Sequence, residues 1–133
     1  MIEIFWLLFA ASCGLTEGFL LHGRPPIKTK PDKHDIFTFQ RTVVGIGFAW
    51  SVYPDFQHIA IFTGYAVLTF SLFHNGAMYE ARKYLSGGNL YPRGWVDEST
   101  TTDAKISMSF FNRLWLFIAG MALYFSYLIL KHL

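Results

Sequence analysis

Three residues of this sequence offer acid–base side chains in or just beyond an apolar stretch, namely Glu17, His74 and Glu80. Glu17 and His74 fall within long apolar stretches, where an ionisable group is costly unless it has a partner or faces a cavity. Glu80 continues the helical pattern of His74 in the stretch FHNGAMYEARKYL. Because carboxylates and imidazoles are common proton-transfer groups, these three residues are the catalytic candidates.

Two arginines offer a complementary chemistry, because guanidinium groups bind carboxylates and phosphates. Arg41 and Arg113 each lie a few residues inside an apolar stretch. Polar residues at a similar depth complete the set of ligand-binding candidates: His22, Gln40, Asn75 and Asn112. Such side chains would hold an anionic ligand or a lipid head group at one membrane face.

Glu17 and Arg41 are also candidates for a simpler role, a salt bridge between neighbouring helices. Each is expected about 7 Å inside its span, at a rise of about 1.5 Å per residue. In this alternative Arg113 extends to the lipid head groups, and the His and Asn residues bridge helices. A proton pathway through Glu17, His22 and His74 is a further alternative, although no ionisable chain continues into the opposite half of the membrane.

A metal site needs several converging ligands, and no two of the five histidines are spaced for one helix face. No cofactor is predicted on this basis. Haem or a metal held by His22 and His74 stays as an alternative, because both are expected at one depth. Nucleophile elbows, phosphate-binding glycine loops and zinc-protease motifs are absent from the sequence.

Four apolar segments would have to position these residues. Apolar residues make up 53 % of the 133 residues and charged residues 15 %, whereas a typical soluble domain has about 25 % charged residues. We therefore predict a single transmembrane domain over 1–133, an all-α compact bundle of four transmembrane helices. The expected spans are about 2–22, 36–53, 56–85 (which includes a cytoplasmic extension) and 104–131.

Local signals mark the helix ends. Gly87 and Gly88 should end the third helix, and Thr102 or Asp103 should cap the fourth. The acidic Glu3 near the start of the first segment argues against a secretory signal, which needs a positive start, and favours an uncleaved span.

Ten of the eleven Lys and Arg residues fall on one side of the predicted membrane, and Lys131 is the exception. The positive-inside rule assigns that side to the cytoplasm. Both termini should then lie on the outer face, and the polar candidates cluster toward the cytoplasm. We expect a bacterial inner membrane as the location. The formal net charge of +2 gives no indication of nucleic-acid binding.

Small residues recur at helical spacing in the first two segments. Ala10, Gly14 and Gly18 form one stripe, and Gly45 and Ala49 form a shorter one. Small residues allow the backbones of membrane helices to approach closely. Two alternatives follow, contact within one bundle and contact between copies of the chain.

These observations favour two hypotheses of different classes. The first is a self-associating helical bundle or an accessory membrane subunit, whose partners are membrane lipid, copies of itself or a larger membrane complex. The second is a small membrane enzyme or carrier that binds a lipid-like or anionic substrate at the cytoplasmic interface. The second predicts an open polar cavity, and a packed cluster of paired groups would argue against it.

Overall fold

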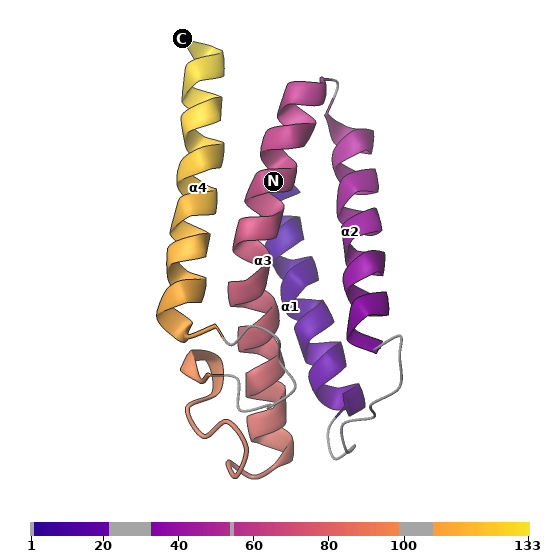
Figure 1. Ribbon diagram of the computed structural model, residues 1–133, viewed down its shortest axis with the longest axis vertical. Helices are drawn as coiled ribbons and strands as arrows, with labels where there is room; N and C mark the ends of the chain where they lie inside the picture. Colours follow the sequence, from indigo (N-terminus) through magenta and orange to yellow (C-terminus); the bar gives the residue numbers. More distant parts are fainter. Residues whose placement is uncertain (1, 22–32, 54, 99–107) are drawn as a thin grey trace.

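The computed structural model describes residues 2–21, 33–53, 55–98 and 108–133, with the backbone alone for residues 21 and 33–39. Within these ranges the chain forms four α-helices and one short 3-10 helix, so the predicted all-α class is confirmed. The elements are α1 (Ile2–Leu21), α2 (Lys33–Val52), α3 (Phe56–Leu85), η1 (Gly94–Val96) and α4 (Phe110–His132). In Figure 1, α3 lies in the middle, with α1 behind it and α2 and α4 on either side.

The bundle has two different ends. The start of α1, the end of α4 and the α2–α3 turn lie toward the upper end in Figure 1, which we call the terminal end. The end of α3 and the short helix η1 lie toward the opposite end, which we call the η1 end. Since α3 has 30 residues and each residue adds about 1.5 Å, α3 connects the two ends.

The predicted stripe of small residues packs α1 against α3 of the same chain. Ala10 is fully buried. A Cβ atom on Gly14 would clash with the backbone carbonyl of His74, and one on Gly18 would lie 2.7 Å from Cβ of Ala81. The stripe therefore makes the contact within one bundle, the first of the two alternatives.

Another face of α3 packs against α4, again through small residues. A Cβ atom on Gly120 would lie 2.9 Å from Cγ2 of Thr69, and one on Gly64 would lie 3.1 Å from Cδ2 of Leu123. Larger side chains at either glycine would push the two helices apart.

The Trp6 ring of α1 contacts both α2 and α3. A Cβ atom on Gly45 would lie 2.9 Å from the Trp6 ring, and Ala49 is fully buried. The indole Nε1 of Trp6 donates a hydrogen bond to the backbone carbonyl of Ala66 at 3.1 Å. Trp6, Ala49 and Ala66 belong to a buried core that is completed by Phe62, Tyr65 and Tyr124.

The helix ends agree with the sequence at α3. The helix stops at Leu85, and Gly87 and Gly88 follow with φ values of 61° and 88°. Both values lie in the left-handed region, which glycine adopts without strain.

The start of α4 differs from the sequence-based expectation. The helix begins at Phe110 rather than near residue 104, and Met108 and Ser109 are not helical. The hydroxyl of Ser109 accepts the backbone N–H of Asn112 at 3.2 Å, so Ser109 is the N-cap. The expected caps Thr102 and Asp103 lie outside the described residues.

Three helical segments among the described residues are long and apolar enough to cross a membrane: Ile2–Leu20, Phe56–Leu85 and Phe110–His132. These three helices support the prediction that the chain is a membrane protein. The fourth helix, α2, has 20 residues but contains Lys33, Asp35 and Arg41, and it is not among them.

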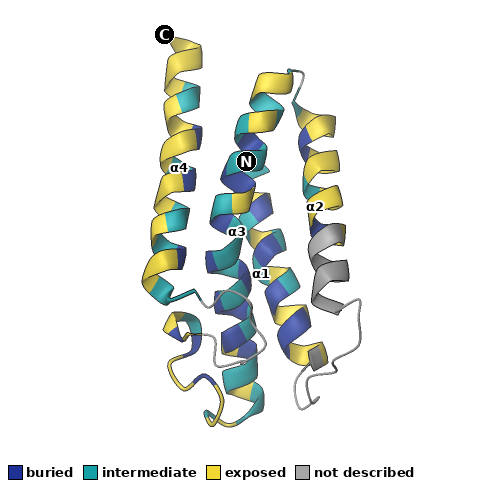
Figure 2. Ribbon diagram, viewed as in Figure 1, coloured by how far each residue is buried: buried dark blue, intermediate teal, exposed yellow. Residues whose placement is uncertain are grey.

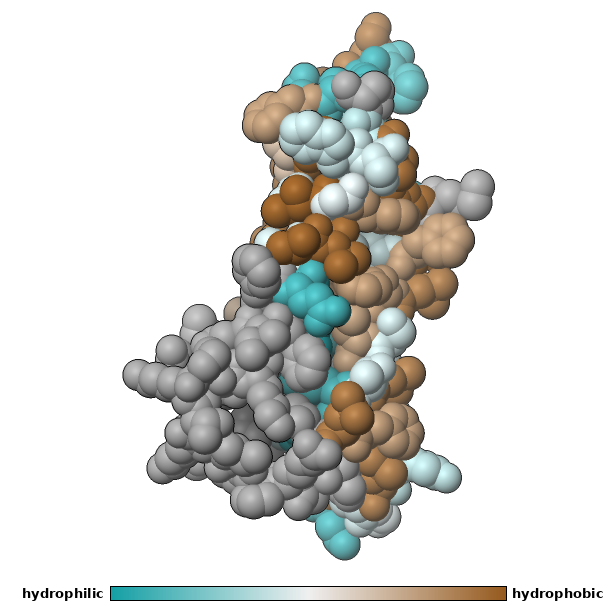
Figure 3. Space-filling model, turned by 90° about the vertical axis from the view of Figure 1, so that its right-hand side faces the viewer, coloured by the Kyte–Doolittle hydropathy of each residue, from teal (hydrophilic) through white to brown (hydrophobic). Residues whose placement is uncertain are grey.

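Exposed residues line the outward faces of all four helices (Figure 2), and many of these residues are large and apolar. Trp50 on α2 is 70 % exposed and Trp115 on α4 is 67 % exposed. In Figure 3, apolar side chains cover most of the coloured surface between the two ends of the molecule. A bilayer is a solvent in which such a surface needs no further burial.

Candidate functional site

The buried carboxylate of Glu17 joins three helices. Its Oε2 atom lies 2.7 Å from Nη2 of Arg41 on α2 and 3.0 Å from Nε2 of His74 on α3. The Glu17 and Arg41 side chains are only 3 % and 10 % exposed. The predicted salt bridge between Glu17 and Arg41 therefore forms. At 2.7 Å the contact is a charge-assisted hydrogen bond as well as an ion pair.

Neighbouring groups on α3 surround this contact. Nδ1 of His74 lies 2.9 Å from Oδ1 of Asn75, and the Asn75 amide donates to the Ser71 hydroxyl at 3.3 Å. The ring of Phe70 stacks on His74 at 4.9 Å and lies 5.6 Å from the Arg41 guanidinium. We call Glu17, Arg41, His74 and Asn75 the Glu17 cluster. Its members are packed against one another rather than around an open polar space.

Glu80 has a different surrounding from the other catalytic candidates. Its Oε2 atom accepts the backbone N–H of Trp95, within η1, at 3.0 Å, and its Oε1 atom lies 3.7 Å from Nζ of Lys83. The side chain is half exposed. Glu80 therefore fixes the segment after α3 and does not join the Glu17 cluster.

Arg113 is fully buried at the start of α4. It does not lie beside Arg41, so the two arginines do not form one anion-binding site. Its Nη2 donates to the backbone carbonyl of Asp97, and its guanidinium lies 5.1 Å from the Tyr79 ring and 5.8 Å from the Phe110 ring. Among the residues that the structure describes, its Nε and Nη1 atoms have no hydrogen-bond partner. Burying polar groups without partners costs free energy.

Two tyrosines continue the packing around Arg113. The Tyr79 and Tyr91 rings stack at 4.4 Å with an interplanar angle of 10°, and the Arg82 guanidinium lies 5.9 Å from the Tyr91 ring. Tyr91 is buried and has φ of 54°, an unusual conformation for a residue with a side chain. The structure thus places Tyr91 against Tyr79 inside the fold.

The remaining candidates do not converge with these groups. Gln40 and Asn112 are exposed, and His22 lies outside the described residues. Of the two histidines considered for haem or a metal, His74 has its Nε2 atom in contact with Glu17. In the part of the chain that the structure describes, no three His, Cys, Asp or Glu side chains are arranged to hold a metal ion.

A second polar cluster, which the sequence did not reveal, lies toward the terminal end. The hydroxyl of buried Tyr124 donates to Oε1 of Glu3 at 2.5 Å. It also lies 3.0 Å from the Tyr53 hydroxyl and 3.4 Å from Nε2 of His58. We call Glu3, Tyr53, His58 and Tyr124 the Tyr124 cluster. Glu3, His58 and Tyr124 each stand in an apolar segment of the sequence, but nothing in the sequence shows that they meet.

The α2–α3 turn borders the Tyr124 cluster through two charged residues. The Asp55 carboxylate accepts the backbone N–H of His58 at 2.6 Å and lies 3.0 Å from Nζ of Lys131. These two contacts hold the pKa of Asp55 below its usual value, and the His58 N–H contributes most among the contacts that lower it. The Lys131–Asp55 pair connects the end of α4 to the α2–α3 turn.

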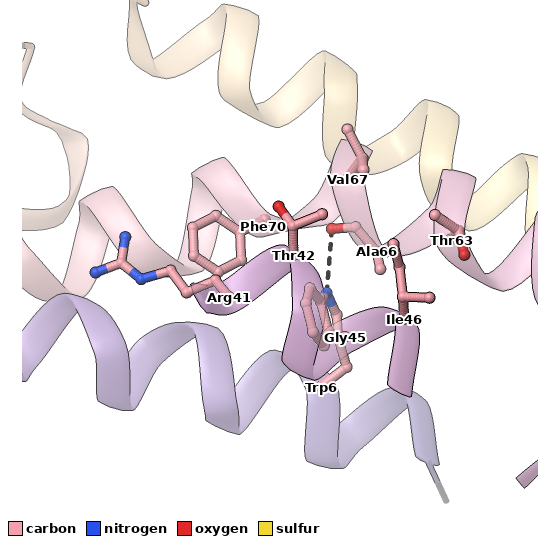
Figure 4. A pocket seen from close by; sticks show the side chains of 9 residues that line it. All are labelled: Trp6, Arg41, Thr42, Gly45, Ile46, Thr63, Ala66, Val67 and Phe70. Carbon is pink, nitrogen blue, oxygen red and sulfur yellow. Dashed lines mark hydrogen bonds between the residues drawn. The ribbon is translucent and has the colours of Figure 1, made fainter. Parts of the chain in front are cut away.

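A groove of about 190 Å³ opens between α2 and α3. Figure 4 shows Arg41 at one end of it, Thr63 and Ile46 at the other, and the Trp6 ring between the two helices. The remaining lining residues are Thr42, Gly45, Ala66, Val67 and Phe70. The groove is mostly apolar, so it suits a hydrocarbon and not a polar substrate.

Chemically, the buried polar groups can hold helices together, and the groove can hold an apolar chain. In the Glu17 cluster the carboxylate is already engaged by Arg41 and His74. In comparisons with protein-family models, curated proteins and solved structures, the chain showed no match.

Proposed function

We propose that this chain is a four-span helical bundle of a bacterial inner membrane, with both termini on the outer face. The three apolar helices support this arrangement, and α2 runs beside them. The connection between Val52 and Phe56 is so short that α2 and α3 must run in opposite directions. In the sequence, ten of the eleven Lys and Arg residues fall in or beside the connections that join the helices at the η1 end, which would be the cytoplasmic side by the positive-inside rule.

We further propose that the bundle is non-catalytic and acts as an accessory membrane subunit or by self-association. The observation that supports this proposal most strongly is the Glu17 cluster. Oε2 of Glu17 on α1 lies 2.7 Å from Nη2 of Arg41 on α2 and 3.0 Å from Nε2 of His74 on α3. A catalytic carboxylate needs access to substrate, and Glu17 is buried. The polar residues on this side therefore act in helix packing.

Association with another chain would use outward faces and not the small-residue stripe, because the stripe is occupied by α3. The outward face of α4 is the strongest candidate. It exposes Phe111, Trp115 and Ile118 along consecutive turns. Helices associate in membranes mainly by packing and hydrogen bonding, and this face provides large side chains for packing.

Single cysteines test the topology, after the native Cys13 is replaced by alanine. Leu133→Cys should react with a membrane-impermeant maleimide in intact cells, because it lies at the terminal end. Asn89→Cys, in the exposed segment after α3, should react only after the membrane is permeabilised. The reverse labelling pattern would contradict the proposed orientation.

Disulfide crosslinking in the same background tests self-association. Trp115→Cys should give a crosslinked dimer under mild oxidation if copies meet through α4. Ala10→Cys is the matched control, since Ala10 is fully buried against its own chain and should give none. If cysteines along α4 and α2 give only monomer and the purified protein copurifies with no other subunit, the accessory function is wrong.

The alternative function, an enzyme or carrier for an anionic substrate, is favoured by Arg113. Its Nε and Nη1 atoms have no partner within the described residues, and a phosphate or carboxylate would satisfy them. Glycerol 3-phosphate should then raise the unfolding temperature of the purified protein, as any ligand of the folded state does. Arg113→Lys retains the charge but loses the planar donors, and it should abolish this rise. No rise in the wild type removes the alternative.

A further inference from the structure

His58 lies in the first turn of α3, and titratable groups from every neighbouring element surround its side chain. These groups are Glu3 of α1, Tyr53 and Asp55 of the α2–α3 connection, and Tyr124, Tyr127 and Lys131 of α4. The imidazole ring stacks on the Tyr53 ring at 3.8 Å and meets the Tyr127 ring edge to face at 5.0 Å. Both ring nitrogens have a polar neighbour, so the partners determine where the ring carries its proton.

One ring nitrogen, Nε2, must carry a proton. It lies 3.4 Å from the Tyr124 hydroxyl, and a hydroxyl has one proton to donate and two lone pairs that accept. Tyr124 donates its proton to Oε1 of Glu3 at 2.5 Å, so it accepts from its other two neighbours. These neighbours are the Tyr53 hydroxyl at 3.0 Å and Nε2 of His58. Nε2 is therefore a donor.

The other ring nitrogen, Nδ1, must be without a proton. It lies 3.5 Å from Nζ of Lys131, and an ammonium group can only donate hydrogen bonds. Nδ1 is therefore an acceptor, and the His58 ring is neutral. Two contacts on opposite sides of the ring thus lead to the same tautomer.

Protonation of His58 is incompatible with this arrangement. A proton on Nδ1 would point at the Lys131 ammonium, and two positive charges would lie about 3.5 Å apart. Asp55 offsets only part of the repulsion, because the His58 backbone N–H engages its Oδ1 and Lys131 engages its Oδ2. Oε1 of Glu3 is engaged by the Tyr124 hydroxyl. The Lys131 ammonium must then move away from His58.

Lys131 attaches the last turn of α4 to the α2–α3 turn. Leu130 and Leu133 on this turn are 73 % and 97 % exposed, so they contribute little packing. Tyr124, two turns earlier, belongs to the buried core, so α4 up to that point stays in place when Lys131 moves. The Lys131 and Asp55 side chains are 41 % and 40 % exposed, so protons from water reach this contact.

We propose that His58 is a proton-sensitive latch: neutral His58 holds the last turn of α4 on the α2–α3 turn through Lys131, and protonation releases that turn. The latched state binds one proton fewer than the released state, so low pH favours release and high pH favours attachment. Histidine titrates between about pH 5 and 8. The compartment rests on the proposed topology, in which the latch responds to the pH outside the cell.

A spin label on Leu130→Cys tests the latch, in detergent micelles and with Cys13→Ala. Between about pH 8 and about pH 5, the mobile population in the electron paramagnetic resonance spectrum should rise about fivefold. This is the effect of two unit charges about 4 Å apart in a water-like medium. The same label on Trp115→Cys, which is exposed near the start of α4, should show no change. Equal responses at both positions would mean that acid loosens the whole helix, and the latch would be wrong.

His58→Gln removes the titrating group but keeps a side-chain N–H for Tyr124, so it should abolish the pH response at Leu130→Cys. His132→Gln is the matched control, since His132 is exposed on the same turn as Lys131, and it should retain the response. No response in the otherwise unchanged chain, a response that survives His58→Gln, or one that is lost in His132→Gln overturns the proposal.

Lys131→Met provides the second variant, because its side chain is exposed and its loss spares the core. Without the ammonium, the last turn should be mobile at both pH values and should no longer respond to acid. A pH response that persists in Lys131→Met also overturns the latch. Micelles have no inner or outer side, so these results are independent of the proposed topology. If the cysteine labelling reverses the topology, the latch remains and only the compartment that it senses changes.

Discussion

The two halves of α3 carry polar clusters built from different chemistry. Toward the η1 end, Glu17 and Arg41 bring formal charges into contact, with His74 as a third partner. Toward the terminal end, the Tyr124 hydroxyl is the shared group, and it contacts Glu3, Tyr53 and His58 at 2.5, 3.0 and 3.4 Å. Each cluster joins side chains from α1, from α3 and from a third helix, which is α2 for the Glu17 cluster and α4 for the Tyr124 cluster.

The difference between the clusters lies in what happens when one member is lost. A buried charge without its partner has no water to solvate it, so breaking one buried pair is more harmful than removing both charges. Loss of a neutral hydroxyl costs less free energy, because its former partners can form hydrogen bonds with one another or with water. The Glu17 cluster should therefore behave as a unit, and the Tyr124 cluster as a sum of separate contacts.

Glu17→Gln should have the largest effect of the substitutions considered for this comparison. It removes the carboxylate that pairs with the Arg41 guanidinium at 2.7 Å. We expect a loss of about 3–5 kcal/mol in the free energy of unfolding, as for other broken buried pairs. Circular dichroism during titration with dodecyl sulfate in mixed micelles measures this loss.

The double variant Glu17→Gln with Arg41→Gln is the control. Removing both charges should restore much of the stability that either single change removes. The exchanged pair, Glu17→Arg with Arg41→Glu, should also recover part of it. If the double variant loses the full sum of the two single losses, the clusters do not differ in the way proposed here.

The sequence predicted the bounds of the first three helices well, because apolar residues fill these segments and Pro or Gly residues separate them. The first, second and third helices were expected at 2–22, 36–53 and 56–85, close to the observed α1, α2 and α3. The late start of α4 was missed because a favourable cap is a local choice between several candidates. Ser109, Thr102 and Asp103 all have capping side chains, and the sequence does not rank them.

The sequence predicted those contacts of the candidate site that follow from the position of a residue along its helix. It did not predict the contacts that depend on which helices are neighbours or on how a helix is rotated. Glu17 and Arg41 were expected at one level on neighbouring helices, and they do meet. Depth alone also grouped Arg113 with Arg41, but the two arginines lie on helices α4 and α2, which are on different sides of α3 (Figure 1). Tyr124 was missed because a hydroxyl on an apolar helix becomes informative only when its rotation toward α1 and α3 is known.

Tyr124→Phe should have an intermediate effect. It removes the shared hydroxyl but retains the ring, which packs against Phe62 and Tyr65 in the core. We expect a loss of about 1–2 kcal/mol in the free energy of unfolding, typical of lost hydrogen bonds. The same dodecyl sulfate titration measures it.

Tyr53→Phe is the matched comparison. The Tyr53 hydroxyl is one of the groups that contact the Tyr124 hydroxyl, and the Tyr53 ring, which the variant retains, stacks on His58. It should cost less than Tyr124→Phe, and the two losses should combine without the recovery expected at Glu17. A recovery in the double variant would mean that the two clusters follow the same rule after all.

Acidification should have the smallest effect, and it acts at the terminal end through Asp55. The His58 N–H and then Lys131 lower the pKa of the Asp55 carboxyl below its ordinary value of 3.8. A carboxyl whose pKa is lower in the folded state stabilises the fold above its unfolded pKa, and this stabilisation is lost as the pH falls toward the folded pKa. Wild type should therefore be slightly more stable than Asp55→Asn near neutral pH, and the difference should disappear as the pH falls below the ordinary value.

Asparagine is the appropriate replacement because it still caps a helix, so the variant isolates the charge of Asp55 from its capping role. Unfolding temperatures of both proteins, measured from neutral pH down through the carboxylate range, give the difference. If it persists at low pH, the Asp55 charge does not contribute and only the geometry of the cap matters. The terminal end would then be held by hydrogen bonds and packing without an electrostatic contribution from Lys131, which would sharpen its contrast with the Glu17 cluster.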